Sequence, residues 1–129
     1  MKIAISYQNQ RELTGHAGKT SRFLIYTLNS STNVVENKEM ITLKREDILH
    51  NRFHESSDPY ASHPLFEVDY IITGEGKIDA QTSNGKLVKG VTTIAQKFHI
   101  PIVGICGKLD LNEAQIQKMG LENVFQIYN

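Results

Sequence analysis

Short apolar runs alternate with polar segments rich in turn-forming residues along this 129-residue chain. The runs have the length and the β-branched content that are typical of buried strands. They predict strands at residues 2–6, 22–28, 34–43, 68–73, 101–106 and 124–128. The turn-forming cluster at residues 29–33 lies between two of them, so we expect residues 22–28 and 34–43 to form an antiparallel hairpin.

Helical spacing is found mainly in the second half of the chain. Apolar residues recur with the period of a helix from Leu87 to Phe98, and Thr82 or Ser83 could cap this helix. A second, short helix is predicted to begin at Asp110 or Asn112 and to end at Gly120. Residues 45–52 could form two helical turns. A helix between the strands at 68–73 and 101–106 makes them parallel through a right-handed crossover.

These elements predict one α/β domain over residues 1–129. We expect three layers: a mixed sheet, antiparallel near the amino terminus and parallel near the carboxyl terminus, with helices on both faces.

The most promising site follows the strand at residues 68–73. Gly74 and Gly76 bracket Glu75, which predicts a sharp turn in a polar loop. Ligands of open α/β sheets bind beyond the carboxyl ends of parallel strands. The loop should therefore lie beside residues 107–110, which leave the next parallel strand. Further polar side chains follow within a few residues: Lys77, Asp79, Gln81, Thr82 and Lys86.

Composition limits the partners. Lys plus Arg and Asp plus Glu each number 14, so no overall field favours nucleic acid or an anionic membrane. The single cysteine, Cys106, excludes an internal disulfide. Together with the absence of a basic-then-apolar leader it predicts a cytoplasmic protein. No apolar run reaches membrane-spanning length.

A glycine-rich segment at residues 14–20 is similar to a phosphate-binding loop. The GxxxxGK[ST] pattern, however, needs glycine where Leu13 stands, and it needs a strand leading directly into a helix. A glycine-rich turn before the next strand is the simpler interpretation.

The second half of the chain carries a group of family-like motifs. They are Ile71-Ile72-Thr73-Gly74-Glu75-Gly76-Lys77-Ile78-Asp79, Gln81-Thr82 with Gly85-Lys86 and Gly90-Val91, Pro101-Ile102-Val103 leading to Gly107, and Gly120-Leu121-Glu122-Asn123-Val124-Phe125. From residue 68 onward the chain resembles the type I bacterial glycerate 2-kinase family. The resemblance implies that Glu75, Lys77, Asp79, Gln81 and Lys86 handle a small hydroxy acid and nucleotide phosphates, with ATP and magnesium as cofactors. Lys108 stands where that family has a serine, and the family's amino-terminal phosphate segment has no counterpart here.

The first half carries different motifs. They are Met1-Lys2-Ile3-Ala4-Ile5, Thr14-Gly15-His16-Ala17-Gly18-Lys19, Arg22-Phe23-Leu24-Ile25-Tyr26, Phe53-His54-Glu55-Ser56 and His63-Pro64-Leu65. Residues 1–73 resemble the dinitrogenase iron-molybdenum cofactor biosynthesis family, the small nitrogenase-accessory type. That resemblance implies a ribonuclease H-like fold and an iron-containing cluster or metal ion as ligand. Gly74-Glu75-Gly76-Lys77 replaces that family's glycine-glycine-methionine-glycine loop. The simplest account is a chimaera, with a nitrogenase-accessory-like half at 1–67 and a glycerate-kinase-like half at 68–129.

Three functions follow from these residues. For phosphoryl transfer, Asp79 or Glu75 could act as base and metal ligand, with Lys77 among the phosphate-facing cations, but the opposing lobe that excludes water is missing. For metal binding, imidazole suits iron and zinc, and the candidate ligands are His16, His54 and His63, with Glu55 and Cys106 in support. For anion binding, the candidates are Gly15, Gly74, Gly76, Gln81, Thr82, Lys86 and Lys108.

Plainer interpretations stand beside each of these. The lysines could simply be solvated, the loop histidines exposed, and Cys106 a small buried hydrophobe. A recombined chain could also keep a fold and have no activity. Our leading hypothesis is a non-catalytic binding module. In it the loops around His16, His54 to His63 and Gly74 to Lys86 form one crevice for a metal-containing or anionic ligand. A glycerate-kinase-like transferase is the alternative, and the hairpin edge could pair with a second copy as a homodimer.

Overall fold

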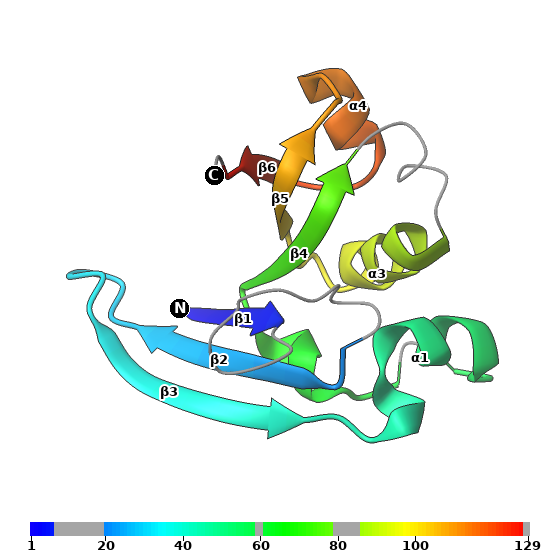
Figure 1. Ribbon diagram of the computed structural model, residues 1–129. Coiled ribbons are helices and arrows are strands. Elements are labelled where there is room, and N and C mark those ends of the chain that lie inside the picture. Colours follow the sequence, from blue (N-terminus) through cyan, green and yellow to red (C-terminus); the bar gives the residue numbers. More distant parts are fainter. Residues whose placement is uncertain (7–19, 59–60, 79–85, 128–129) are drawn as a thin grey trace.

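The computed structural model describes residues 1–6, 20–58, 61–78 and 86–127, and Figure 1 shows their arrangement. The strands are β1 (Lys2–Ser6), β2 (Arg22–Leu28), β3 (Val35–Thr42), β4 (Tyr70–Ile78), β5 (Ile102–Leu109) and β6 (Asn123–Gln126). The α-helices are α1 (Leu49–Glu55), α3 (Lys86–Lys97) and α4 (Glu113–Lys118). Two short 3₁₀ helices, η1 (Arg45–Asp47) and η2 (Pro64–Glu67), precede α1 and β4.

The described strands form one six-stranded sheet in the order β3-β2-β1-β4-β5-β6. Strand β2 is antiparallel to both β1 and β3. The pair β2–β3 confirms the predicted hairpin. Strands β1, β4, β5 and β6 are parallel. The predicted mixed α/β sheet, antiparallel at one side and parallel at the other, is therefore confirmed.

Strand β1 joins the two halves of the chain. It pairs with β2 on one side and with β4 on the other, where Ala4 lies opposite Ile71. The backbone N–H of Lys2 also donates to the Asp69 carboxylate over 2.7 Å. One sheet thus runs without interruption through residues from both halves.

One face of the sheet is much more buried than the other. Alternate strand residues such as Ala4, Ile71 and Ile102 are at most 2% exposed, whereas their neighbours Ile72 and Val103 are partly exposed. The buried side belongs to a hydrophobic core that also includes Leu49 of α1, Ile94 and Ala95 of α3, and Ile116 of α4. All three described α-helices therefore contribute to the core on the same face.

The predicted third layer is not found in the described part of the chain. Helix α1 packs against α3, as Figure 1 shows. Gly120, which follows the end of α4, lies directly against Thr92 of α3. The crossovers β4-α3-β5 and β5-α4-β6 both lead to the next strand in the same direction across the sheet. Two right-handed crossovers of this kind place their helices on the same face, which explains why α3 and α4 form one layer.

Strands β4 and β5 extend farther than the sequence predicts. The glycine-bracketed segment from Gly74 to Lys77 was expected to turn, but its backbone continues β4 as far as Ile78. Likewise β5 continues through Lys108 to Leu109 instead of ending at residue 106. The two strands pair along this extension, with Lys77 opposite Lys108. Each strand thus satisfies the backbone groups of the other, which outweighs the low strand propensity of glycine and charged residues.

Helix boundaries agree better with the prediction. Asn112 accepts a hydrogen bond from the backbone N–H of Gln115 at 2.9 Å, and the Gln115 side chain accepts one from Asn112, which makes a capping box on α4. Gly120 has a φ of 90°, so its predicted role in ending that helix is confirmed. The predicted cap of α3 by Thr82 or Ser83 lies outside the described residues.

The outer edge of the sheet is formed by β3, which is exposed along nearly its whole length. Val35 and Met40 are more than half exposed there. Pairing of this edge with a second copy stays a prediction. In the described part of the chain, no helix has the length and apolar character needed to cross a membrane.

Candidate functional site

The candidate site lies where the parallel strands β4 and β5 end together. Lys77 is opposite Lys108, and Ile78 is opposite Leu109. The Lys108 side chain is exposed at this edge. The register thus places Lys77, a predicted phosphate-facing residue of the kinase-like alternative, opposite Lys108, a predicted anion-binding residue. Both are strand residues and not parts of two loops.

Strand β6 supports this edge through a side chain. Backbone pairing between β5 and β6 reaches Cys106, and beyond it the Gln126 carboxamide oxygen accepts a hydrogen bond from the Leu109 N–H at 2.9 Å. Gln126 therefore fixes the backbone next to Lys108 after the ladder has ended. Gln126 is not among the predicted site residues; its one signal in the sequence is a polar residue inside the otherwise apolar strand pattern at residues 124–128.

Several predicted site residues cannot be placed from this structure. Gly15, His16, Asp79, Gln81 and Thr82 lie outside the described residues. The structure describes the backbone of Glu75, Lys77, Lys86 and His54 but not their side chains. Gly74 and Gly76 are strand residues of β4. The roles assigned to these residues stay predictions.

His63 has a clear structural role. It is 4% exposed and caps the 3₁₀ helix η2, with its Nδ1 accepting a hydrogen bond from the Leu65 N–H at 3.0 Å. Its Nε2 lies 2.7 Å from the Asp47 carbonyl oxygen, to which it donates in the matching tautomer. Both ring nitrogens are thus engaged with the backbone. As a metal ligand, His63 would have to give up one of these bonds.

The surroundings of His63 are a packed cluster. The buried guanidinium of Arg52 donates to the Ala61 and Ser62 carbonyl oxygens at 2.8 and 3.0 Å. The Phe66 ring stacks on His63 at a centroid distance of 4.8 Å and on Phe98 at 4.0 Å. Burial lowers the pKa of His63 below 6.5, so the imidazole is neutral at physiological pH.

His63 also lies far from the β4–β5 edge. It precedes the amino end of β4, and this nine-residue strand corresponds to about 25–30 Å of extended chain. Lys108 lies at the opposite, carboxyl end. The predicted single crevice therefore does not include His63 together with the strand-end lysines, because the connection before β4 enters at the other side of the sheet.

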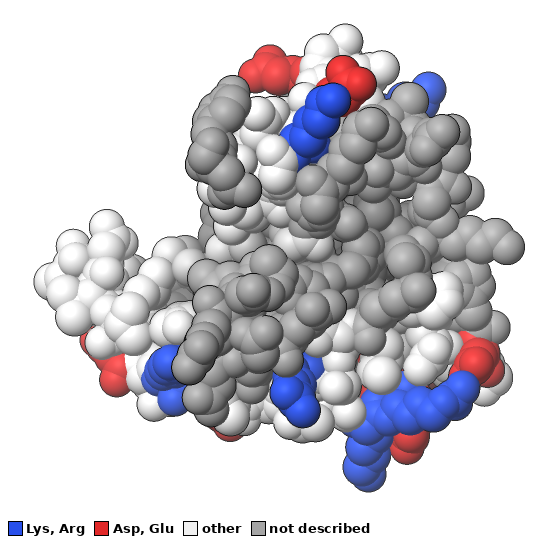
Figure 2. Space-filling view, viewed as in Figure 1, with Lys and Arg blue, Asp and Glu red and all other residues white. Residues whose placement is uncertain are grey.

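Metal ligands do not gather in the part of the chain that the structure describes. No group of three or more His, Cys, Asp or Glu residues is close enough there to hold a metal ion. Cys106 is 1% exposed and belongs to the hydrophobic core, in line with its interpretation as a small buried residue. Figure 2 shows Lys, Arg, Asp and Glu interspersed over the described part of one face.

Comparison with known proteins gives a consistent result for the second half of the chain. The family model described as "Glycerate kinase family" matches residues 61–129. The chain is 46% identical to a glycerate kinase of Bacillus cereus over 59 residues, which is 46% of this chain and 16% of the relative. It is 40% identical to glycerate 2-kinase of Escherichia coli over 63 residues, which is 49% of this chain and 16% of the relative.

A solved structure, the putative glycerate kinase 2 from Salmonella typhimurium LT2, is 41% identical and covers 50% of this chain and 15% of its own. The TM-score of 0.34 is too low to compare the two folds.

These matches lie in the segment that contains β4, α3, β5, α4 and β6. The chain spans about 16% of the length of these curated relatives. Residues 1–60 lie outside the family match, so their resemblance to the nitrogenase-accessory type stays a prediction. Because the family model matches more than half of the residues, the chain belongs to the glycerate kinase family.

Proposed function

We propose that this chain is a glycerate-kinase-like protein that binds a small hydroxy-acid or phosphate anion at the carboxyl ends of β4 and β5. The observation that carries the proposal is the register between Lys77 and Lys108, inside the segment matched by the glycerate kinase family. The proposal replaces the nitrogenase-type binding module as the leading hypothesis.

Charge supports an anion at this edge. Like charges at directly opposed strand positions are unfavourable, and a bound anion between them would relieve the repulsion. The carboxyl ends of parallel strands are also the usual ligand edge of an open α/β sheet. Gln126 holds the Leu109 N–H and thereby fixes the backbone beside Lys108.

Phosphoryl transfer demands more than anion binding. It needs positioned nucleotide phosphates, a base and a site closed to water. Magnesium would require carboxylate oxygens, for which the family resemblance offers Glu75 and Asp79. Since neither carboxylate is described and the chain is much shorter than its relatives, our proposal is limited to anion binding, and Lys108 is the lysine whose side chain is described at this edge.

The binding proposal is tested by titrating the protein with glycerate and with phosphoglycerate while amide NMR shifts are recorded. We expect saturable shifts at Lys108 and Leu109. Lys108→Gln should weaken binding about fivefold, since an exposed charge pair contributes up to about 1 kcal/mol. The matched control is Lys118→Gln, an exposed lysine in the last turn of α4, which should bind as the parent does. Equal affinity of the Lys108→Gln variant would refute the proposal.

Turnover is tested separately with ATP and glycerate, by measuring phosphoglycerate. If the chain completes transfer, Asp79→Asn should abolish the rate and the exposed loop variant Asp58→Asn should not. An equal rate in the Asp79→Asn variant removes that residue from the mechanism.

We also infer a ribonuclease H-like fold class. Its support is the central β1, which is flanked by the antiparallel β2 and β3 and by the parallel β4 and β5.

A further inference from the structure

Strand β3 forms one edge of the sheet, and its outer side faces away from the other strands. In Figure 1 no described element lies beyond it. Every residue of the strand is exposed except Ile41, which is partly buried and packs against the core. Met40 is an apolar side chain at this edge and is 59% exposed. An edge of this kind can pair with a further strand.

The hydrogen-bond pattern shows which backbone groups of β3 point outward. The Leu43 N–H donates to the Ser21 carbonyl oxygen at 2.6 Å, so these two residues form a hydrogen-bonded position of the β2–β3 pair. Hydrogen-bonded positions alternate along an antiparallel pair. Every second residue before Leu43 therefore faces β2, and the residues between them face outward. The outward-facing residues are Lys38, Met40 and Thr42.

The side chains of β3 restrict how two copies could pair about a two-fold axis, where one residue lies opposite itself. An axis at Lys38 or at Glu39 would oppose two like charges directly, which is unfavourable. An axis at Ile41 would oppose Lys38 to the second copy's Lys44. Axes nearer the ends of the strand would meet the irregularity of the ladder beside Glu36 or the helix η1.

An axis at Met40 avoids these conflicts. It brings the two exposed Met40 side chains together and keeps the central pairs within residues 38–42, where the ladder is regular. The other opposed pairs are Lys38 with Thr42, Glu39 with Ile41, and Glu36 with Lys44. The last of these is an attractive charge pair at each end of the contact. The two Glu39 side chains are diagonal neighbours, which lie farther apart than directly opposed residues.

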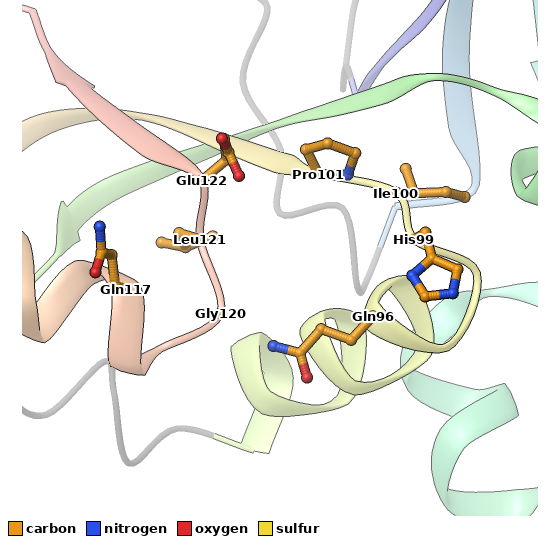
Figure 3. Close-up of a pocket in the computed structure, with 8 residues that line it drawn as sticks. All are labelled: Gln96, His99, Ile100, Pro101, Gln117, Gly120, Leu121 and Glu122. Carbon is orange, nitrogen blue, oxygen red and sulfur yellow. The ribbon is translucent and has the colours of Figure 1, made fainter.

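The other edge of the sheet is less suited to pairing. Strand β6 has four residues, Asn123–Gln126. Before it, Leu121 and Glu122 line a cleft between the ends of α3 and α4, which Figure 3 shows. A contact between β3 of one copy and β6 of another would also leave an open edge on each copy, so assembly could continue. Two β3 strands instead form a closed contact.

We propose that two copies of this chain pair their β3 strands antiparallel about a two-fold axis at Met40, so that one sheet runs through both. The outward-facing backbone groups hold the strands together, and the Met40 side chains pack across the axis. A single short strand pair is a small contact, so the dimer is weak. Strand β3 lies outside the family match and is separated from β4 by β2 and β1, so the dimer does not depend on anion binding.

Sedimentation equilibrium of the full chain between about 10 µM and about 1 mM tests the proposal in the range of weak complexes. We expect a monomer–dimer equilibrium, and slower amide exchange of Lys38, Met40 and Thr42 at the higher concentration. Met40→Lys should weaken the dimer at least about tenfold, because it opposes two like charges on the axis. Thr42→Glu should tighten it at least about twofold, because the new carboxylate lies opposite Lys38.

The matched control is Phe125→Lys, the same kind of change at a position that is 56% exposed on β6. It should dimerise within about twofold of the parent, and all three variants should keep the parent's dispersed amide spectrum. A parent that stays monomeric, or that forms species larger than a dimer, would overturn the proposal. So would a dimer that Met40→Lys leaves unchanged, that Thr42→Glu fails to tighten, or that Phe125→Lys weakens as much as Met40→Lys does.

Discussion

At the scale of single residues, His63 is the clearest case of a side chain with a defined physical role. Its ring accepts from the Leu65 N–H and donates to the Asp47 carbonyl oxygen, and it stacks on Phe66. Only the neutral imidazole can do both, since a protonated ring has no acceptor. Burial lowers its pKa for the same reason, because the charged form would lose its hydration.

This pKa shift predicts a pH dependence of stability. The unfolded chain binds the His63 proton more tightly than the folded chain does, so acid favours unfolding. The contribution of His63 is complete above its unfolded value of 6.5 and is lost as the pH falls below it. His63→Asn keeps a capping side chain without a titrating group. We expect it to lower stability by about 1–2 kcal/mol at neutral pH and to reduce the loss between about pH 7.5 and pH 5.

The measurement is the free energy of unfolding in urea at the two pH values. His99→Asn is the control, because His99 is exposed and asparagine also tolerates left-handed backbone. That variant should keep the parent's pH dependence. If His63→Asn lost as much stability in acid as the parent does, burial of His63 would not be the cause.

At the scale of elements, local signals and long-range pairing decide different features. A cap of α4 at Asp110 or Asn112 and the terminal Gly120 were predictable, because each depends on a few neighbouring residues. The ends of β4 and β5 were not. Gly74 to Gly76 looks like a turn by composition, and only pairing with a strand some thirty positions away in the chain makes it extended.

The candidate site shows the same division. Sequence reasoning predicted that the carboxyl ends of β4 and β5 lie side by side, which their pairing confirms, because the alternation of strands and helices fixes which ends meet. The binding role of Lys108 at this edge stays a prediction. Sequence reasoning missed Gln126, whose role depends on the exact place where the β5–β6 ladder stops. It also grouped His63 with the loops at the other edge, because a histidine near a turn carries no sign of which edge it occupies.

The carboxyl ends of α3 and α4 give a paired prediction. A Cβ on Gly120 would lie 2.8 Å from the Gln96 amide nitrogen and 2.9 Å from Thr92 Cβ, and the backbone there is left-handed. Gly120→Ala should therefore cost about 2–4 kcal/mol, from strain and crowding together. His99 has the same backbone conformation but already carries a side chain. His99→Gly should change stability by less than about 1 kcal/mol, since relief of strain offsets the greater freedom of the unfolded chain.

Urea denaturation of both variants checks this pair. The decisive result is that Gly120→Ala lowers the free energy of unfolding by more than His99→Gly changes it. A Gly120→Ala variant as stable as the parent would mean that α3 and α4 do not approach each other as closely as the structure shows.

At the scale of the whole molecule, the boundary of the family match is not a boundary in the sheet. The glycerate kinase match begins at residue 61, yet β4 from the matched segment pairs directly with β1 from outside it. The core likewise joins Leu49 of α1 to Ile94 of α3 and Ile102 of β5. A chain assembled from two sources would still have to fold as one unit, because neither part covers its own apolar face.

That continuity predicts coupled unfolding of the two halves. Leu49 is 1% exposed and lies in α1, which packs against α3. Leu49→Ala should cost about 2–5 kcal/mol through lost burial and a cavity. Amide signals of Ile25 in β2 and Val124 in β6 should disappear at one urea midpoint, and that midpoint should fall equally for both in the variant. Val34→Ala, at a position 58% exposed, should shift neither by more than about 0.5 kcal/mol. If Leu49→Ala lowered the Ile25 midpoint and left that of Val124 unchanged, the halves would be independent and the anion site would have to be stable without β1 beside β4.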